Sequence, residues 1–396
     1  MNILYIWDAD YPWDVRVEKI SNALMSAGHE VHVASRNLKK KPVYEKVNDL
    51  HIHRTNIWRN DKLNYFFSFP LFCSPIWKRF LDRLIEENNI DVIIVRDLPL
   101  AIAGIWAGRR YNVPVIFDMA EDYVAMVRDI WKLRKFKGLN LLVRNPYLAK
   151  MVEKYTFSNI DHTLVVIDEA IDVVVNGGGN VLDVSVVSNT PDLEVFSSKR
   201  SLFDSEAMRE MKESFSVIYT GGIQLGRGLQ LVVEAMPKVI KYIPNFRFVV
   251  VGDGYAVDQI KKLVSEKGLG EYVIWVGWVS HEEIYSYISS SSVGIIPHYV
   301  TDHVKTTIPN KIFDYMGCGI PVIASDSPPM KKIIDDNECG LVFRDRNVEE
   351  LANSIISLYN SDINYGENGK KAVFDEYNWS RDTERLFSVI NKLASK

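Results

Sequence analysis

Short apolar runs alternate with helical segments along this chain, and the alternation stops once and then starts again. The first series runs from residues 2–6 to 184–188, and the second runs from 217–219 to 340–343. Strands that alternate with helices form parallel sheets covered by helices on both faces. The pattern therefore predicts an α/β protein with two Rossmann-like, doubly wound parallel-sheet domains, which we expect to face each other across a cleft.

A polar, charged stretch between the two series marks the domain boundary. We expect an N-terminal domain at 1–195, a linker at 196–214, a C-terminal domain at 215–375 and an amphipathic helix at 376–396. A chain of 396 residues is too long for one ordinary core. In doubly wound sheets ligands bind outside the carboxyl ends of the strands, so the loops that follow the strands are the expected places for chemistry.

Composition excludes several classes of protein. Hydrophobic residues make up 47% and charged residues 25%, as in soluble globular enzymes, and the net charge of −4 argues against a nucleic-acid partner. The three cysteines (Cys73, Cys318 and Cys339) fit neither a disulfide framework nor a zinc-ligand spacing, which favours a reducing compartment. The start has no signal-peptide pattern, and no apolar run approaches the ~20 residues that span a bilayer. We therefore expect a cytoplasmic protein.

A glycine-rich turn follows the first strand of the second series. Gly221, Gly222, Gly226 and Gly228 let backbone amides approach a ligand closely, and Arg227 adds a cation just before a helix. This arrangement suits a pyrophosphate, although a plain glycine turn with a solvated arginine is equally compatible with it. Gly252 and Gly254 form a second, weaker Gly-x-Gly turn after the next strand, of a kind that any tight strand-to-helix connection uses.

The segment 306–325 carries the most specific pattern. We expect Pro309 to start a helix whose first amides are free to bind an anion. Asp314, inside that helix, suits a ribose diol as a hydrogen-bond acceptor; taken alone, a solvated helix acid would explain it better. Trp278 and Val279, in the loop before a helix capped by Ser280, lie where a nucleotide base would be bracketed by backbone contacts.

Taken together and in order, these motifs resemble the GT-B glycosyltransferases of the retaining family 4 (glycosyltransferase group 1). The resemblance covers nearly the whole chain and implies a nucleotide-diphosphate sugar bound to the C-terminal half and an acceptor bound to the N-terminal half. It implies that the last helix returns to the N-terminal domain. It also implies a donor-binding set, which comprises Gly221, Gly222, Arg227, Gly252, Gly254, Trp278, Val279, Thr306, Thr307, Pro309, Asn310, Lys311 and Asp314.

The chain departs from the family pattern at three donor positions, one of which is Pro328-Pro329, where the family often has a glycine pair that supplies amide donors. Thr306 stands where the family has an acid that contacts the donor sugar, and Gly222 stands where it has a phosphate-binding arginine. Arg227 keeps the second cation, and Lys311 is the expected substitute for the missing charge. Arg227 and Lys311 are therefore the expected catalytic cations, which stabilise the leaving diphosphate.

Acids and arginines also gather at the strand ends of the N-terminal half. We expect Asp118 to be a catalytic residue that faces the acceptor. The expected acceptor-binding residues are Asp14, Arg16, Arg96, Glu121 and Asp122. For Glu121 and Asp122, a role as acids matched to a helix N-terminus explains the sequence equally well.

The resemblance implies a same-face displacement in which the departing phosphate oxygen takes the acceptor proton. No dedicated base, no metal and no cofactor are then expected. Asp8-Ala-Asp10 spells the Asp-x-Asp string of metal-dependent glycosyltransferases, but it follows a βαβ strand, and we interpret it as coincidental.

Residues 131–154 combine basic, aromatic and aliphatic side chains, and 131–145 contain no acid. Such a segment suits an anionic membrane interface, so we expect peripheral contact with the inner face of a membrane and a glycan or lipid-linked acceptor. A pair of ordinary amphipathic helices is the alternative.

Three other functions share parts of these patterns. A sugar-nucleotide 2-epimerase of the same fold would isomerise its substrate without an acceptor. A degenerate glycosyltransferase would bind nucleotide sugar or a partner without turnover, as the changes at Gly222 and Thr306 allow. A dehydrogenase is disfavoured because the first strand lacks the Gly-x-Gly-x-x-Gly turn and its ribose acid.

Overall fold

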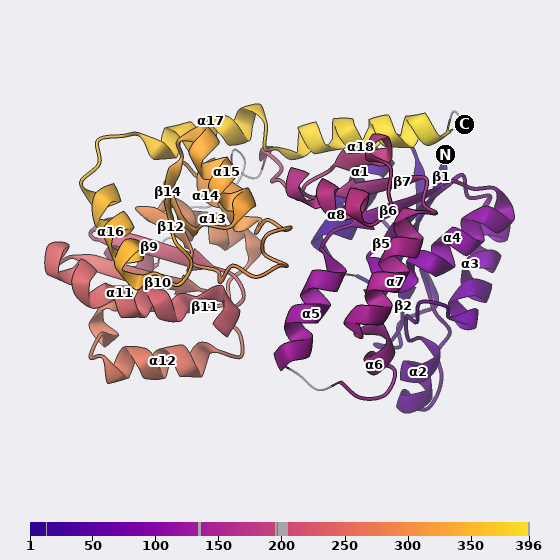
Figure 1. Ribbon diagram of the computed structural model, residues 1–396, viewed down its shortest axis with the longest axis horizontal. Helices are drawn as coiled ribbons and strands as arrows, with labels where there is room; N and C mark the ends of the chain where they lie inside the picture. The colour runs from indigo at the N-terminus through magenta and orange to yellow at the C-terminus, as the bar shows by residue number, and fades with distance from the viewer. Residues whose placement is uncertain (13, 134–135, 195, 197–204, 395–396) are drawn as a thin grey trace. The chain divides into compact units, whose positions relative to one another are not determined.

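The computed structural model describes residues 1–12, 14–133, 136–194, 196 and 205–394. The chain divides into two compact units. The first comprises Met1–Asn189 together with the C-terminal stretch from Asp382, and the second comprises Thr190–Arg381. Figure 1 shows the elements of each unit with the labels used below.

The first unit is built on an eight-stranded sheet with the order β3-β4-β2-β1-β5-β6-β7-β8. The strands are β1 (Asn2–Asp10), β2 (Glu30–Arg36), β3 (Tyr44–Val47), β4 (Leu50–Arg54), β5 (Val92–Arg96), β6 (Val115–Met119), β7 (His162–Val165) and β8 (Val184–Val186). All neighbouring strands pair in parallel except β3, which runs antiparallel to β4 at the edge. The strands β3 and β4 were not predicted from the sequence, because β3 is short and polar and its residues are largely exposed.

Helices and short 3-10 turns connect these strands. The helices are α1 (Val15–Ser26), α2 (Asp61–Phe67), α3 (Pro75–Asn88), α4 (Ala101–Tyr111), α5 (Tyr123–Leu133), α6 (Asn140–Val143), α7 (Pro146–Phe157) and α8 (Ile171–Asn176). The 3-10 turns are η1 (Leu98–Leu100), η2 (Asp168–Ala170) and η3 (Val181–Asp183). Asn60, Ser74 and Asn145 cap α2, α3 and α7 by accepting hydrogen bonds from first-turn amides, which satisfies donors that a helix start leaves unpaired.

The second unit has a six-stranded, all-parallel sheet with the order β11-β10-β9-β12-β13-β14. The strands are β9 (Phe215–Thr220), β10 (Phe246–Val251), β11 (Val273–Gly277), β12 (Val293–Ile296), β13 (Val322–Ser325) and β14 (Gly340–Phe343). The helices are α10 (Glu206–Lys212), α11 (Leu229–Tyr242), α12 (Val257–Glu266), α13 (His281–Ser289), α14 (Lys311–Gly317), α15 (Pro328–Asn337), α16 (Val348–Tyr359) and α17 (Tyr365–Asp375), with turns η4 (Leu225–Arg227) and η5 (Gly270–Tyr272).

Both sheets are doubly wound, as the sequence pattern predicts. Central strands such as Ile3–Ile6 and Phe248–Val251 are continuous apolar runs, buried because helices cover parallel sheets. The last helix, α18 (Trp379–Ala394), begins in the second unit, and its residues from Asp382 on belong to the first. The segment expected as a linker at 196–214 contains α10, whose buried Met208 and Met211 make it part of the second unit.

Candidate functional site

The strand orders place one crevice in each unit. In the first sheet β1 lies between β2 and β5, and in the second sheet β9 lies between β10 and β12. At such positions the connections leave in opposite directions, which opens a crevice at the carboxyl ends of the strands. The candidate residues predicted from the sequence follow these strands, so they lie at that edge of each unit.

In the second unit, a glycine turn after β9 is held by close backbone contacts. Gly228 has a φ of +73°, and a Cβ added there would meet the carbonyl oxygen of Pro297 at 1.8 Å. Gly252 has a φ of +137° and lies against the carbonyl of Gly221, with 2.0 Å between its Cβ position and that oxygen. Only glycine fits both constraints, so the turn is fixed against its neighbours.

Two cations converge on this turn. The Nζ atom of Lys311 lies 3.3 Å from the Cβ position of Gly221 and 3.7 Å from the centre of the Tyr219 ring. Arg227 contacts His298, with 3.1 Å between Nη1 and Nδ1. Within the described part of the chain, neither Arg227 nor Lys311 has a carboxylate within ion-pair distance. The turn is therefore flanked by uncompensated positive charge.

Burial shifts the pKa values of the basic side chains in this cluster. Burial lowers the pKa of Lys311 well below its ordinary value, the charge of Arg227 lowers it further, and Asp314 opposes both. Burial also lowers the pKa of His298, with Lys311 and Arg227 adding to the effect, so His298 is neutral near pH 7. A neutral His298 adds no positive charge to the cluster, and a bound anion would favour the charged form of Lys311 beside Arg227.

Asp314 lies one turn along α14 from Lys311. It is partly buried, and Tyr285 donates a hydrogen bond to it over 3.4 Å. The structure starts α14 at Lys311, so the expectation that Pro309 starts the helix is wrong by two residues. Pro309 accepts only a turn hydrogen bond, from Ile312.

The remaining donor candidates lie in loops of the same unit. Thr307 donates its hydroxyl to the carbonyl of His303, as Thr306 also does. Gly254 lies against the Ile223 carbonyl, whereas Gly222 and Asn310 are exposed. Trp278 is 78% exposed, and Val279 beside it is partly buried.

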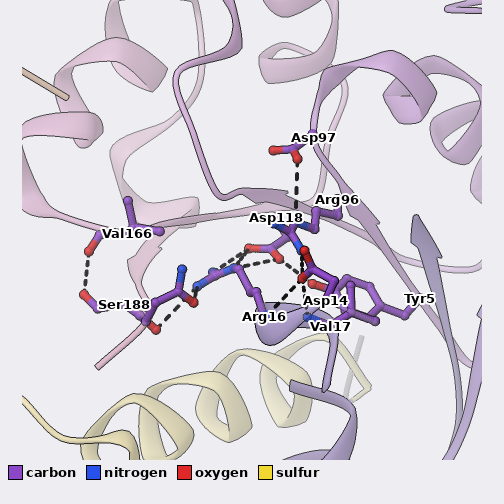
Figure 2. A network of polar contacts seen from close by, with 10 residues as sticks. Tyr5, Asp14, Arg16, Val17, Arg96, Asp97, Asp118, Val166 and Ser188 are labelled. Atoms are coloured by element: carbon purple, nitrogen blue, oxygen red, sulfur yellow. Dashed lines mark hydrogen bonds and ion pairs between the residues drawn. The ribbon is translucent and has the colours of Figure 1, made fainter. Parts of the chain in front are cut away.

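In the first unit, Asp118 is the centre of a buried network, shown in Figure 2. Arg16 donates from Nε to both carboxylate oxygens at 2.9 Å and from Nη2 at 2.5 Å. Tyr5 donates its hydroxyl to the same carboxylate at 2.6 Å, and Arg16 also reaches Asn189 at 2.9 Å. Burial alone would raise the pKa of Asp118, but Arg16 and the hydrogen bonds outweigh burial and hold that pKa below its ordinary value.

This burial corrects two expectations. The side chain of Asp118 is 0% exposed and that of Arg16 is 1% exposed, so neither presents a group to an acceptor. Their ion pair instead holds the start of α1 against the end of β6. We therefore reassign Asp118 and Arg16 from acceptor contact to positioning.

A second ion pair lies beside the first. Arg96, at the end of β5, pairs with Asp14, which also caps α1 by accepting from the amides of Arg16 and Val17. The Arg96 guanidinium stacks on Trp7 at 4.3 Å. The structure thus brings Asp14, Arg16, Arg96 and Asp118 together in one network, as Figure 2 shows.

The last two acceptor candidates differ from each other. Asp122 is 7% exposed and accepts from the amide of Ala125, so it has the helix-capping role that the sequence left as an alternative. Glu121 is exposed and lines a cavity of about 450 Å³ in the first unit. Asp8 and Asp97 also line this cavity, and the sequence analysis did not select either for the acceptor site.

Among the residues that the structure describes, no three His, Cys, Asp or Glu side chains gather in a way that would hold a metal ion. No helix in the described ranges is both long and apolar enough to cross a bilayer.

Comparison with known proteins agrees with this arrangement. Residues 214–361 match the family model "Glycosyl transferases group 1", and residues 14–190 match "Glycosyl transferase 4-like domain". An uncharacterized glycosyltransferase of Methanocaldococcus jannaschii is 21% identical over 63% of this chain and 63% of its own length. The matched region thus spans less than two thirds of that relative. The α-monoglucosyldiacylglycerol synthase of Acholeplasma laidlawii is 21% identical over 86% of this chain and 83% of its own.

A solved structure shares the fold across the chain. Sucrose-phosphate synthase from Thermosynechococcus elongatus superposes with a TM-score of 0.77 at 19% identity, covering 100% of this chain and 99% of that one. The two family models follow each other along the sequence and coincide with the two Rossmann-like units. The chain therefore belongs to the group 1 glycosyltransferases of the GT-B fold.

Proposed function

We propose that this protein is a retaining, metal-independent glycosyltransferase. It moves a sugar from a nucleoside-diphosphate donor to a glycan or lipid-linked acceptor, in surface polysaccharide or glycoconjugate synthesis. The observation that carries the proposal is the pair of uncompensated cations, Arg227 and Lys311, beside the glycine turn at the carboxyl end of β9. A diphosphate supplies the negative charge that this cluster lacks.

Each donor group then has a place in the second unit. Arg227 and Lys311 hold the diphosphate, Asp314 accepts from the ribose hydroxyls, and the loop at Trp278 and Val279 brackets the base. Thr306, Thr307 and Asn310 line the sugar side of the same site. These cations, rather than a metal ion, neutralise the leaving group in this proposal.

The proposed transfer needs no separate base. The bond between the anomeric carbon and the donor phosphate oxygen breaks, and the acceptor oxygen bonds to that carbon on the same face. The acceptor proton passes to the departing phosphate oxygen, and the charge on the diphosphate is stabilised by Arg227 and Lys311. Charge stabilisation on the leaving group is the main task left to the protein.

We also propose peripheral contact with the inner face of a membrane through residues 131–154. Tyr147 and Met151 on α7 are 81% and 71% exposed, and Lys150 and Lys154 lie on the same helix. Large apolar side chains beside lysines suit an anionic lipid surface. The lipid product named in the A. laidlawii relative is consistent with such an acceptor.

Calorimetric titration with UDP-glucose, GDP-mannose and ADP-glucose, in the presence of EDTA, tests the donor site. One nucleotide class is expected to bind. The Lys311→Met substitution is expected to lower the affinity for that class by roughly 10–100-fold, which is the effect of losing one charge-assisted hydrogen bond. Lys261→Met is the matched control, because Lys261 also lies over an aromatic ring, 5.3 Å from Trp275, but outside the turn. Equal binding by Lys311→Met and wild type would remove the donor-site assignment.

Turnover separates the remaining alternatives. Binding without release of nucleotide, in the presence of acceptors, would favour the degenerate binding subunit. Release of a sugar epimerised at C2 would favour the 2-epimerase.

A further inference from the structure

The cavity of the first unit occupies the crevice of its sheet. Its volume is about 450 Å³, and it is lined from the ends of β1 and β5, from α5 and from the α6 segment. That volume lies in the range of small-molecule sites and suits a sugar with a substituent. Neither Arg16 nor Asp118 lines the cavity, but Asp97 does, and its carboxylate lies beside Arg96 of their network.

Two carboxyl groups in the cavity lack hydrogen-bond donors. Within the described residues the side chain of Asp8 makes no hydrogen bond, and Oδ1 of Asp97 is buried without a partner. The other oxygen of Asp97 lies 3.6 Å from Nε of Arg96. Burial raises the pKa of Asp8 to about 6, against the opposing charges of nearby arginines. Buried polar oxygens are normally satisfied, so Oδ1 of Asp97 awaits a donor such as a sugar hydroxyl, and the partly buried carboxyl of Asp8 is available to a second one.

A cation in the same cavity makes no ion pair within the described residues, although its charge acts on the carboxyl of Asp8. The guanidinium of Arg144 stacks on Phe136 at 5.3 Å and, within the described part of the chain, has no hydrogen-bond or ion-pair partner. Arg36, the other cation of the cavity, is buried and donates to Ser68 Oγ at 3.2 Å and to the Tyr65 carbonyl at 3.1 Å. Arg144 is therefore the cation that is available to a phosphate.

An apolar surface continues from the cavity. Phe69, Met126 and Ile130 line its wall. At its edge Nδ2 of Asn140 donates to the Tyr65 hydroxyl at 2.8 Å, which joins α6 to α2, and Figure 1 shows these helices side by side. Exposed apolar side chains flank this contact: Leu63 and Phe66 on α2, and Leu141 and Leu142 on α6.

We propose that this cavity binds the acceptor as a sugar phosphate, with sugar hydroxyls on Asp8 and Asp97 and the phosphate on Arg144. The proposal rests on the proposed function and names its acceptor class. A free sugar phosphate and a lipid-linked sugar phosphodiester share this chemistry. The lipid chain of the second would lie along Leu63, Phe66, Leu141 and Leu142.

The test is calorimetric titration of the full chain, without donor, with three kinds of probe. The first is a panel of the 1-phosphates of glucose, galactose, mannose and N-acetylglucosamine. The second is the decyl phosphodiester of each of these, and the third is the matching neutral decyl glycosides. We expect Arg144→Gln to lower the affinity for the phosphate-bearing probes at least about tenfold and to leave the affinity for the neutral glycosides unchanged.

A matched arginine controls for loss of charge and stacking. Arg83 stacks on Phe80 at 5.8 Å in the same unit but does not line the cavity, so Arg83→Gln should bind every probe as the wild type does. Decyl phosphodiesters that bind at least about tenfold tighter than the free phosphates identify the lipid-linked source, because a decyl chain gains affinity only on an apolar surface. Equal affinity for the decyl phosphodiesters and the free 1-phosphates identifies the free sugar phosphate as the source.

Two outcomes would overturn the proposal. One is that no phosphate-bearing probe binds, and the other is that Arg144→Gln binds them as the wild type does.

A second measurement concerns Asp8 alone. The Asp8→Asn substitution should raise the melting temperature near neutral pH, since it removes an unpartnered charge, and should lower the affinity for all sugar probes. A lower melting temperature would show that Asp8 is a structural carboxylate. Donor titrations on the same variants separate this proposal from the proposed function, because Arg144→Gln should bind nucleotide sugar normally.

Discussion

Arg16 and Asp118 lie 102 positions apart in the sequence and form a fully buried ion pair at the carboxyl end of β6. Removing one partner from such a pair leaves the other charge buried without compensation. The pair also fixes α1, which begins at Val15, against the sheet. The crevice of the first unit is therefore shaped partly by a buried contact.

Asp118→Asn is expected to lower the free energy of unfolding at neutral pH by about 3–5 kcal/mol, measured by urea denaturation. Because the folded-state pKa of Asp118 lies below its ordinary value, the stabilisation is present above the unfolded pKa and is lost as pH falls through the folded one. Glu349→Gln, in the exposed pair with Lys238, should cost less than about 1 kcal/mol. A loss for Asp118→Asn no larger than that of the control would contradict this role.

Lys311 makes donor binding depend on pH. Its pKa in the free protein is lowered by burial and by Arg227, and a bound diphosphate favours the charged form. Donor affinity should therefore fall as pH rises through that lowered pKa, with proton uptake on binding, and Lys311→Arg should abolish both effects. Calorimetry at a series of pH values up to the ordinary pKa of lysine, about 10.4, in buffers of different ionisation enthalpy, checks this. Wild-type binding with no proton uptake anywhere in that range would refute it.

The sequence predicted the place of a single residue well only where that residue belongs to a short, recognisable motif. Gly221 and Lys311 are 90 positions apart, yet each stands in its own recognisable motif, and the structure brings them together. The partner of Asp118 lies far away in the sequence, so the burial of Asp118 was not predictable, and Asp118 was expected to face the acceptor. His298 was missed because a single histidine after a strand has no distinguishing pattern, although it contacts Arg227.

Among the elements, the turn between β9 and α11 is the most constrained. Gly228 combines a positive φ with the Pro297 carbonyl where a Cβ would stand, whereas Gly226 has open space around its Cβ position. Gly228→Ala should displace the turn, cost at least about 1–3 kcal/mol in stability and weaken donor binding, while Gly226→Ala should change neither. Chemical denaturation and donor titration of the two variants are the measurement. Equal behaviour of the two alanine variants would show that the turn tolerates movement.

The main elements of both sheets were predictable, because buried parallel strands are continuous apolar runs between helices. The β3–β4 hairpin escaped prediction because β3 (Tyr44–Val47) is polar and lies at the edge. Within the expected linker, α10 was missed because Ser205 caps a helix of only seven residues. Apart from an alanine, the two buried methionines are the only apolar residues of that helix.

At the scale of the whole molecule, the two crevices carry different chemistry. The crevice of the second unit holds two cations without carboxylate partners in the described chain, which suits a diphosphate. The crevice of the first unit holds unpartnered carboxyls and one available arginine, which suits a hydroxylated, anionic acceptor. This division of charge supports the proposal that the second unit binds the donor and the first unit binds the acceptor.

The central claim is transfer from a nucleotide sugar with retention, and real-time proton NMR of donor hydrolysis tests it without a known acceptor. The protein is mixed in EDTA with UDP-glucose, GDP-mannose or ADP-glucose, and the anomer released first is identified before it mutarotates. We predict that one donor class releases its nucleotide and that the α-linked sugar appears first as the α-anomer, more slowly with Lys311→Met. First appearance of the β-anomer, or no nucleotide release from any donor even with the sugar-phosphate probes present, would contradict the account.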